Sequence, residues 1–251
     1  DAQESRGLGD VYKRQAKNRL ADFPHYLMHR AEQLDNLYIF KNTEGTPENI
    51  RKFHPNIIVS STGSAPLLPP IAGLKDRIDN EKHNIYSILG MISHINDFPK
   101  DLEGKKVVVV GGGAVGLDVV EFFADRNADI SIVEMMDQIG RDLDPVSKND
   151  TKTMMKKHNV HQLTKTALLE VKDSSFLVRG DGEPYELPFE YGFVCLGMRA
   201  QGQLYQNLTE EFSSEDVEIM NIGDSQRARR IIDGTQEGRN ILTILEQKGY
   251  L

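Results

Sequence analysis

The spacing of hydrophobic positions predicts an α/β fold, because it changes between strand and helix patterns along the chain. Within Lys105–Glu134 an apolar run, VVVV, leads into GGGAVG. A helical pattern of apolar residues follows, and then a second apolar run that ends in an acid. A strand, a tight turn, a helix and a second strand in this order predict a βαβ unit, which belongs to parallel sheets.

The rest of the chain shows the same two patterns, separated by stretches rich in proline and glycine. STGSAPLLPPIAGL carries three prolines, Pro66, Pro69 and Pro70, and two glycines, Gly63 and Gly73, so it is expected to be an extended crossing. The remaining predicted elements are a helix with Tyr26, Leu27, Ala31 and Leu34 on one face, a short strand over Asn56–Ser60, a helix over Pro145–His158, β-rich pieces over Ala167–Val178, a turn over Gly180–Pro184, strands in YGFVCLG and VEIMNIGD, and a helix over about 229–247.

The glycines of GGGAVG indicate dinucleotide binding. Gly111 allows the tight turn, Gly113 lets the backbone approach a pyrophosphate, and Gly116 lets the helix pack closely on the strand. The phosphates are expected at the start of the helix, beside Ala114 and Val115, where unpaired N–H groups and the helix dipole favour negative charge.

An acid at the end of the second strand indicates which dinucleotide binds. Glu134 lies 18 residues after Gly116, where a carboxylate can accept hydrogen bonds from the ribose hydroxyls of NAD. A 2′-phosphate would meet a like charge there, and Met135 and Met136 follow where an Arg would be expected. The sequence therefore predicts NADH rather than NADPH.

Composition narrows the class of protein. The chain is 39% hydrophobic, has a net charge of −8, and contains no apolar run of the roughly 18 residues that a membrane span needs. An acidic surface argues against nucleic acid as a partner. Cys195 is the one cysteine, so a disulfide framework and a CxxC motif are excluded within this chain. We expect a cytoplasmic protein that does not contact membranes.

The first fifteen residues are expected to be foreign to the fold. Ser5–Gln15, SRGLGDVYKRQ, back-translates without a gap to a transposon-end adapter used in DNA library preparation. Residues 1–15 are therefore interpreted as a non-native, adapter-derived segment. The alternative is a genuine polar N-terminal tail.

Three short glycine-containing motifs follow one another along the chain in a specific order: TGSAP over Thr62–Pro66, the GGGAVG turn, and NIGD over Asn221–Asp224. This order resembles flavoproteins in which a NAD domain is inserted into an FAD domain. More closely, EMMDQIGRDLDP and IGDSQRARRIIDGTQEGRNI resemble the C-terminal half of the old-yellow-enzyme-related NADH:flavin oxidoreductases, the family of 2-enoate and 2,4-dienoyl-CoA reductases. The resemblance implies a Rossmann-like NAD domain over 104–200, inserted into a partial FAD-binding domain of the pyridine-nucleotide-disulfide-reductase type over 16–103 and 201–251.

The same resemblance implies a larger flavoprotein. Its N-terminal part would be a barrel with FMN and a 4Fe-4S cluster, and electrons would pass from NADH through FAD and the cluster to FMN and an activated alkene. The barrel, the cluster cysteines and the first glycine fingerprint for FAD do not occur in these 251 residues. The chain is therefore interpreted as a fragment, the electron-input half of an enoate-reductase-like oxidoreductase, whose partner is the missing N-terminal barrel of the same chain.

Further cofactor-binding residues follow from this resemblance, each beside a plainer interpretation. Asp224 would accept hydrogen bonds from the FAD ribityl hydroxyls, or it is a simple helix cap. Thr62 and Gly63 would let the backbone pass the flavin, or they form an ordinary turn. Gly197 would leave room for nicotinamide, or it only ends a strand. Arg230, with its neighbour Arg229, would neutralise phosphate or reduced flavin, or it is solvated.

No side chain is assigned an acid or base role, because the implied hydride transfer from nicotinamide to flavin needs binding and orientation from the protein. His158 and His161 have metal-ligand spacing but lie where a helix gives way to a strand, so no metal is predicted. Two other classes stay open: a disulfide-reductase-like flavoprotein and a non-catalytic NAD-binding module.

Overall fold

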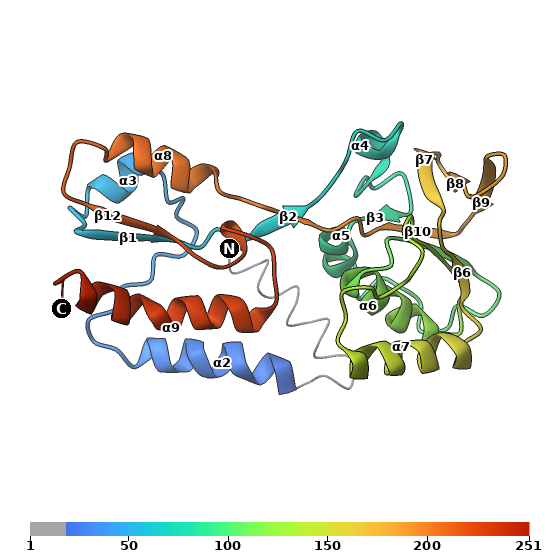
Figure 1. The fold of residues 1–251 in the computed structure, drawn as a ribbon, viewed down its shortest axis with the longest axis horizontal. Helices are drawn as coiled ribbons and strands as arrows, with labels where there is room; N and C mark the ends of the chain where they lie inside the picture. The colour runs from blue at the N-terminus through green and yellow to red at the C-terminus, as the bar shows by residue number, and fades with distance from the viewer. Residues whose placement is uncertain (1–18, 251) are drawn as a thin grey trace. The chain divides into compact units, whose positions relative to one another are not determined.

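The computed structural model describes residues 19–250, which divide into two compact units (Figure 1). Among the described residues, the first unit consists of 36–65 and 198–250, and the second of 19–35 and 66–197. Helix α2 (Arg19–Glu32) lies within 19–35. The adapter-derived segment expected over 1–15 lies outside the described residues.

A five-stranded parallel sheet forms the centre of the second unit, in the order β3-β10-β4-β5-β6 (Figure 1). Its strands are β3 (Ile85–Tyr86), β4 (Lys106–Val110), β5 (Asp129–Val133), β6 (His161–Leu163) and β10 (Tyr191–Val194). The VVVV run is β4, at the middle of this order, and all four valines are buried. Successive side chains of a strand point to opposite faces, so an unbroken apolar run indicates that both faces are covered.

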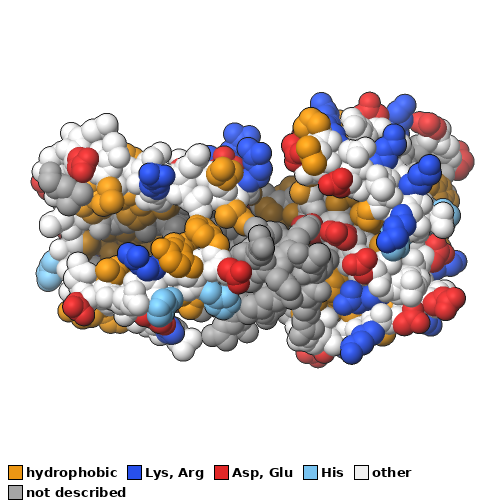
Figure 2. Space-filling view, turned by 90° about the horizontal axis from the view of Figure 1, so that it is seen from below, with side chains coloured by type: hydrophobic (Ala, Val, Ile, Leu, Met, Phe, Trp, Pro, Cys, Tyr) orange, Lys and Arg blue, Asp and Glu red, His pale blue; other side chains and the backbone are white. Residues whose placement is uncertain are grey.

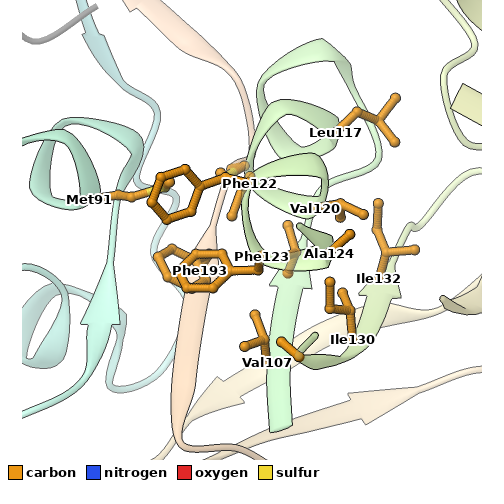
Figure 3. Close-up of a cluster of buried hydrophobic side chains, with 14 of the residues drawn as sticks. Met91, Val107, Leu117, Val120, Phe122, Phe123, Ala124, Ile130, Ile132 and Phe193 are labelled. Carbon is orange, nitrogen blue, oxygen red and sulfur yellow. The ribbon is translucent and has the colours of Figure 1, made fainter. Parts of the chain in front are cut away.

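One face of the sheet is covered by helices α5 (Ile88–Ser93), α6 (Ala114–Ala124) and α7 (Pro145–Lys157). Val107 and Val109 of β4 pack there with Phe123 of α6 and Phe193 of β10, as Figure 3 shows for several members of this cluster. The rings of Phe123 and Phe193 lie 4.8 Å apart between centroids. Aromatic side chains thus pack among the aliphatic ones in the helix–sheet contact.

The other face of the sheet packs against a three-stranded antiparallel sheet of β7 (Ala167–Val171), β8 (Ser175–Arg179) and β9 (Tyr185–Pro188). Val108 and Val110 belong to this second cluster with Phe176 and Val178 of β8. The short helix α4 (Leu74–Arg77) adds the fully buried Leu74. The βαβ unit predicted from Lys105–Glu134 is thus buried on both sides.

The start of helix α7 has a clear local cause. The carboxylate of Asp144 accepts hydrogen bonds from the backbone N–H groups of Val146 and Ser147, and Pro145 occupies the first helical position. Both features are typical of a helix N-terminus. The predicted helix over Pro145–His158 is confirmed, with His158 as the residue that caps its end.

The first unit contains a two-stranded parallel sheet in which β1 (Ile57–Ser60) pairs with β12 (Glu218–Asn221). A second two-stranded sheet joins β2 (Ser64–Pro66) to β11 (Met198–Ala200). The other elements are α3 (Pro47–Arg51), α8 (Gln203–Glu211), the 3-10 turn η1 (Gly223–Ser225) and α9 (Ile231–Gln247). The core cluster of this unit consists of Ile58, Leu208 and Phe212.

The boundary between the two units lies at 65/66 in the structure, whereas the sequence predicts it at 103/104. Residues 66–103, assigned above to the FAD-binding part, group with the second unit, which contains the residues expected to bind NAD. The reason is that β3 pairs with β10, while Met91, Ile92 and Phe98 enter the cluster behind the central sheet. A strand of two residues is too short to show a period from which this pairing could be predicted.

The described surface is mixed in character. Acidic and basic side chains are interspersed at the right of Figure 2, and hydrophobic side chains reach the surface at its left. Across residues 19–250, no helix has both the length and the apolar character needed to pass through a membrane.

Candidate dinucleotide-binding site

The site begins where strand β4 ends and helix α6 starts. Gly111 adopts a positive φ of 108°, and a Cβ there would lie 2.1 Å from the carbonyl oxygen of Cys195. A Cβ on Gly116 would lie 1.9 Å from the carbonyl oxygen of Gly111. Gly111 is therefore required by its positive φ and by the backbone of Cys195 beside it, and Gly116 by the close approach of the turn to helix α6.

Gly113 differs from these two glycines. It caps helix α6 with an ordinary φ of −78°, and a Cβ there would meet nothing within 4 Å. Gly113 and Ala114 are exposed, and no side chain caps this end of α6. The N–H groups of Ala114, Val115 and Gly116 have no acceptor one turn earlier in the helix, so they can bind an anion.

Glu134 stands beside this loop, at the end of β5. One carboxylate oxygen, Oε2, accepts a 2.6 Å hydrogen bond from the N–H of Gly112, and Oε1 accepts a 2.7 Å bond from the N–H of Met136. The side chain is half-buried. A carboxylate has about four acceptor sites, so two remain for ribose hydroxyls.

The two bonds of Glu134 give it a second role that sequence reasoning missed. By accepting from Gly112, the carboxylate ties the glycine loop to the end of the neighbouring strand. Met135 and Met136 are exposed beside it. The acid and the glycines are visible in the sequence. The hydrogen bond between Glu134 and the loop is not, so the sequence alone could not show that the acid already holds the loop.

In the first unit, several residues predicted to contact flavin are joined by hydrogen bonds. The Ser64 hydroxyl donates to Oδ2 of Asp224 over 3.1 Å, and the backbone N–H of Arg229 donates to Oδ1 over 3.1 Å. The Thr62 hydroxyl donates to the carbonyl of Gln201 over 2.6 Å. Asp224 thus holds both neighbouring segments, and it keeps acceptor capacity for a ligand.

Gly63 and Gly197, the two glycines predicted to lie beside the flavin and the nicotinamide, adopt the backbone conformation that favours glycine. Gly63 has a φ of 77° and Gly197 a φ of 106°, and a Cβ on either would meet nothing within 4 Å. Gly63 belongs to the first unit and Gly197 to the second. Each therefore leaves open space beside its own stretch of backbone.

The predicted arginines differ in their surroundings. Arg229 pairs with Glu237, so its charge has a partner inside the unit. The Arg230 guanidinium lies 3.7 Å from Asp233, and its side chain is 83% exposed. Arg230 is therefore the one of the two whose charge faces solvent.

The two histidines and the cysteine singled out in the sequence are the remaining candidates, and neither a metal site nor a reactive thiol is found among the described residues. His161 lies 3.4 Å from a carboxylate oxygen of Asp129, and within residues 19–250 no three His, Cys, Asp or Glu side chains gather as metal ligands would. Cys195 is buried, and burial raises the pKa of its thiol to about 12. A thiol with that pKa is not a nucleophile at neutral pH.

Three features define the class: a glycine turn at the start of helix α6, an acid at the end of strand β5, and the Asp224 turn after strand β12. They are those of the dinucleotide-binding module of a flavin-dependent oxidoreductase. Comparison with protein families agrees. Residues 26–220 match the family described as pyridine nucleotide-disulphide oxidoreductase, and the chain belongs to this family.

Two curated relatives are each 26% identical to this chain. A metal reductase from Desulforamulus reducens matches 87% of the chain and 36% of its own length, and an NADH oxidase from Thermoanaerobacter brockii matches 76% and 28%. Among solved structures, a 2-naphthoyl-CoA reductase is similar to 92% of the chain with a TM-score of 0.75 and 20% identity, over 33% of its own length. The chain thus spans about a third of the length of these proteins.

Proposed function

We propose that this chain is the electron-input half of a flavin-dependent oxidoreductase, in which electrons pass from NADH to FAD and on to an activated alkene. The observation that carries the proposal is the glycine loop held by Glu134, with Gly113 open to a ligand. It is supported by membership of a family named for pyridine nucleotides and by a relative named NADH oxidase.

The nicotinamide-binding part of the proposal rests on three local features. The N–H groups at the start of α6 would bind the pyrophosphate, the space beside Gly113 would admit it, and Glu134 would accept from the ribose hydroxyls. A 2′-phosphate would bring a second anion against the Glu134 carboxylate, so we infer NADH as the donor.

The flavin-binding part rests on the Asp224 turn. With Oδ1 and Oδ2 each accepting one bond, Asp224 is fixed in orientation and can still accept from the ribityl hydroxyls of FAD. Arg230 follows Asp224 closely in the sequence and is exposed, and its positive charge would stabilise the negative charge of reduced flavin or of a phosphate. When both cofactors are bound, NADH supplies a hydride and FAD accepts it, while these residues bind and orient.

We further propose that an N-terminal part of the same protein completes the first unit and carries FMN and a 4Fe-4S cluster. In the described part of the chain β1 pairs with β12 alone, whereas parallel sheets have more strands and are covered on both faces. Leu37, Tyr38, Ile39 and Phe40 are exposed in the same unit. The relatives' greater length and the name 2-naphthoyl-CoA reductase support a barrel acting on an enoate or enoyl-CoA type substrate.

The nicotinamide part is tested on this chain by calorimetric titration with NADH and NADPH. Binding of NADH with at least tenfold preference over NADPH is expected, and no binding of either would refute the proposed role. The flavin part is tested on the complete protein from the source gene. FAD, FMN and iron should copurify with it, and bleaching of the flavin by NADH should be reversed by an enoate.

A disulfide-reductase-like activity is the alternative that the family name favours. Such a reaction needs a pair of reactive cysteines. This chain has Cys195 alone, buried in the second unit and with a raised pKa. Any cysteine pair would have to come from a part of the protein outside these residues, so mapping of cysteines in the complete protein separates the two activities.

A further inference from the structure

Helix α9 contributes a carboxylate to the turn that carries Asp224. Gly223 opens this turn with a positive φ of 66°, and its backbone N–H donates a 2.7 Å hydrogen bond to Oε2 of Glu237. Glu237 lies 14 residues later in the chain, on the second turn of α9. The bond therefore ties the turn to the side of the helix that follows it.

The other oxygen of the same carboxylate reaches the far side of the turn. Oε1 of Glu237 forms an ion pair with the guanidinium of Arg229. The backbone N–H of Arg229 in turn donates to Oδ1 of Asp224. Glu237 thus binds Gly223, directly before Asp224, through Oε2. Through Oε1 it binds Arg229, whose backbone N–H donates to Asp224.

We propose that Glu237 is a positioning residue, which fixes the Gly223–Asp224 turn so that the Asp224 carboxylate is oriented for the flavin; the flavin role rests on the proposed function. The two oxygens of Glu237 accept from the Gly223 N–H and from the Arg229 guanidinium, and a neutral side chain would bind these two donors less well. An amide at this position has one oxygen, so it can replace one bond and must turn an NH2 group toward the other donor.

The ionisation of Glu237 agrees with this arrangement. The hydrogen bond from the Gly223 N–H and the bond from Arg229 lower the pKa of the Glu237 carboxyl, against smaller opposing effects of desolvation and of Asp233. The same carboxylate raises the pKa of Arg229. A carboxyl whose pKa falls on folding stabilises the folded state above its ordinary pKa, and that contribution disappears as the pH drops through the lowered value. The contact therefore persists at neutral pH.

The first test measures the turn directly in this chain by amide hydrogen exchange. Glu237→Ala should raise exchange in a peptide covering 222–229 about tenfold, and Glu237→Gln should raise it less. Glu246→Ala is the matched control, since Glu246 is an exposed glutamate on the same helix. Unchanged exchange in Glu237→Ala would overturn the proposal, as would equal loosening of the β1 and β12 peptides, which would mean general unfolding.

The second test measures flavin in the complete protein. Glu237→Ala should lower FAD affinity about tenfold and shift the flavin absorbance band, while the NADH affinity of the same complete protein stays unchanged. A looser turn with wild-type FAD affinity would overturn the positioning role. If the wild-type complete protein holds no FAD, the proposed flavin function fails, and hydrogen exchange alone then decides whether Glu237 fixes the turn.

Discussion

Replacing Gly113 by alanine should separate cofactor binding from folding. The backbone of Gly113 has an ordinary φ of −78°, and the added methyl group would meet no protein atom within 4 Å. Alanine is a poorer helix cap than glycine by roughly 0.5–1 kcal/mol, but it also restricts the unfolded chain, which stabilises the fold by about 0.4–1 kcal/mol. The two effects oppose each other, so the free energy of unfolding should change by less than about 0.5 kcal/mol.

The same methyl group would project into the space proposed for the pyrophosphate. Moving the phosphates away from the N–H groups of α6 would weaken hydrogen bonds to a charged group, which contribute about 1.5–3 kcal/mol. At 1.4 kcal/mol for each factor of ten, the dissociation constant for NADH should rise roughly 10- to 150-fold. The measurement is a calorimetric titration with NADH, combined with thermal unfolding of the same samples.

Two further glycines provide matched controls. Gly182→Ala adds a methyl group that also meets nothing within 4 Å, in the turn before β9, and should alter neither quantity. Gly116→Ala places its Cβ 1.9 Å from the carbonyl oxygen of Gly111 and should destabilise the fold by about 1–3 kcal/mol or more. A folded Gly113→Ala variant that binds NADH as tightly as wild type would refute the assignment of this turn.

Three other predictions concern the second unit. Glu134→Ala should weaken NADH binding by about 1.5–3 kcal/mol, because ribose contacts are lost and the Gly112 N–H loses its acceptor; equal titration curves would remove the ribose role. Phe193→Ala should lower the free energy of unfolding by about 3–5 kcal/mol in urea, because a fully buried ring is removed, and a loss below 1 kcal/mol would contradict the packing. Cys195 should resist iodoacetamide until the protein is unfolded. Because folding raises the pKa of its thiol from 9.0 to about 12, the unfolded chain releases this proton first, so the thiol's contribution should make stability fall above pH 9; native labelling at pH 8 would count against burial.

Local features of the sequence determined the dinucleotide turn. The VVVV run, three glycines at fixed spacing and the helical pattern after them are short-range signals, and each acts through sterics within one turn or one strand. Gly111 and Gly116 are required by contacts that the motif itself contains, apart from the carbonyl of Cys195. The proline and glycine content of the crossing at 62–73 likewise predicted an extended chain with little regular structure.

Tertiary structure decided the features that depend on residues far apart in the chain. Strand β3 belongs to the second unit because it pairs with β10, more than a hundred residues later. Glu134 holds Gly112, and Glu237 holds Gly223 and pairs with Arg229, through bonds that no periodicity encodes. A hydrogen bond between side chain and distant backbone requires a specific position and direction, and these arise when β-strands and helices pack into one core. Sequence periodicity specifies which face of an element is buried, but not which neighbour it meets.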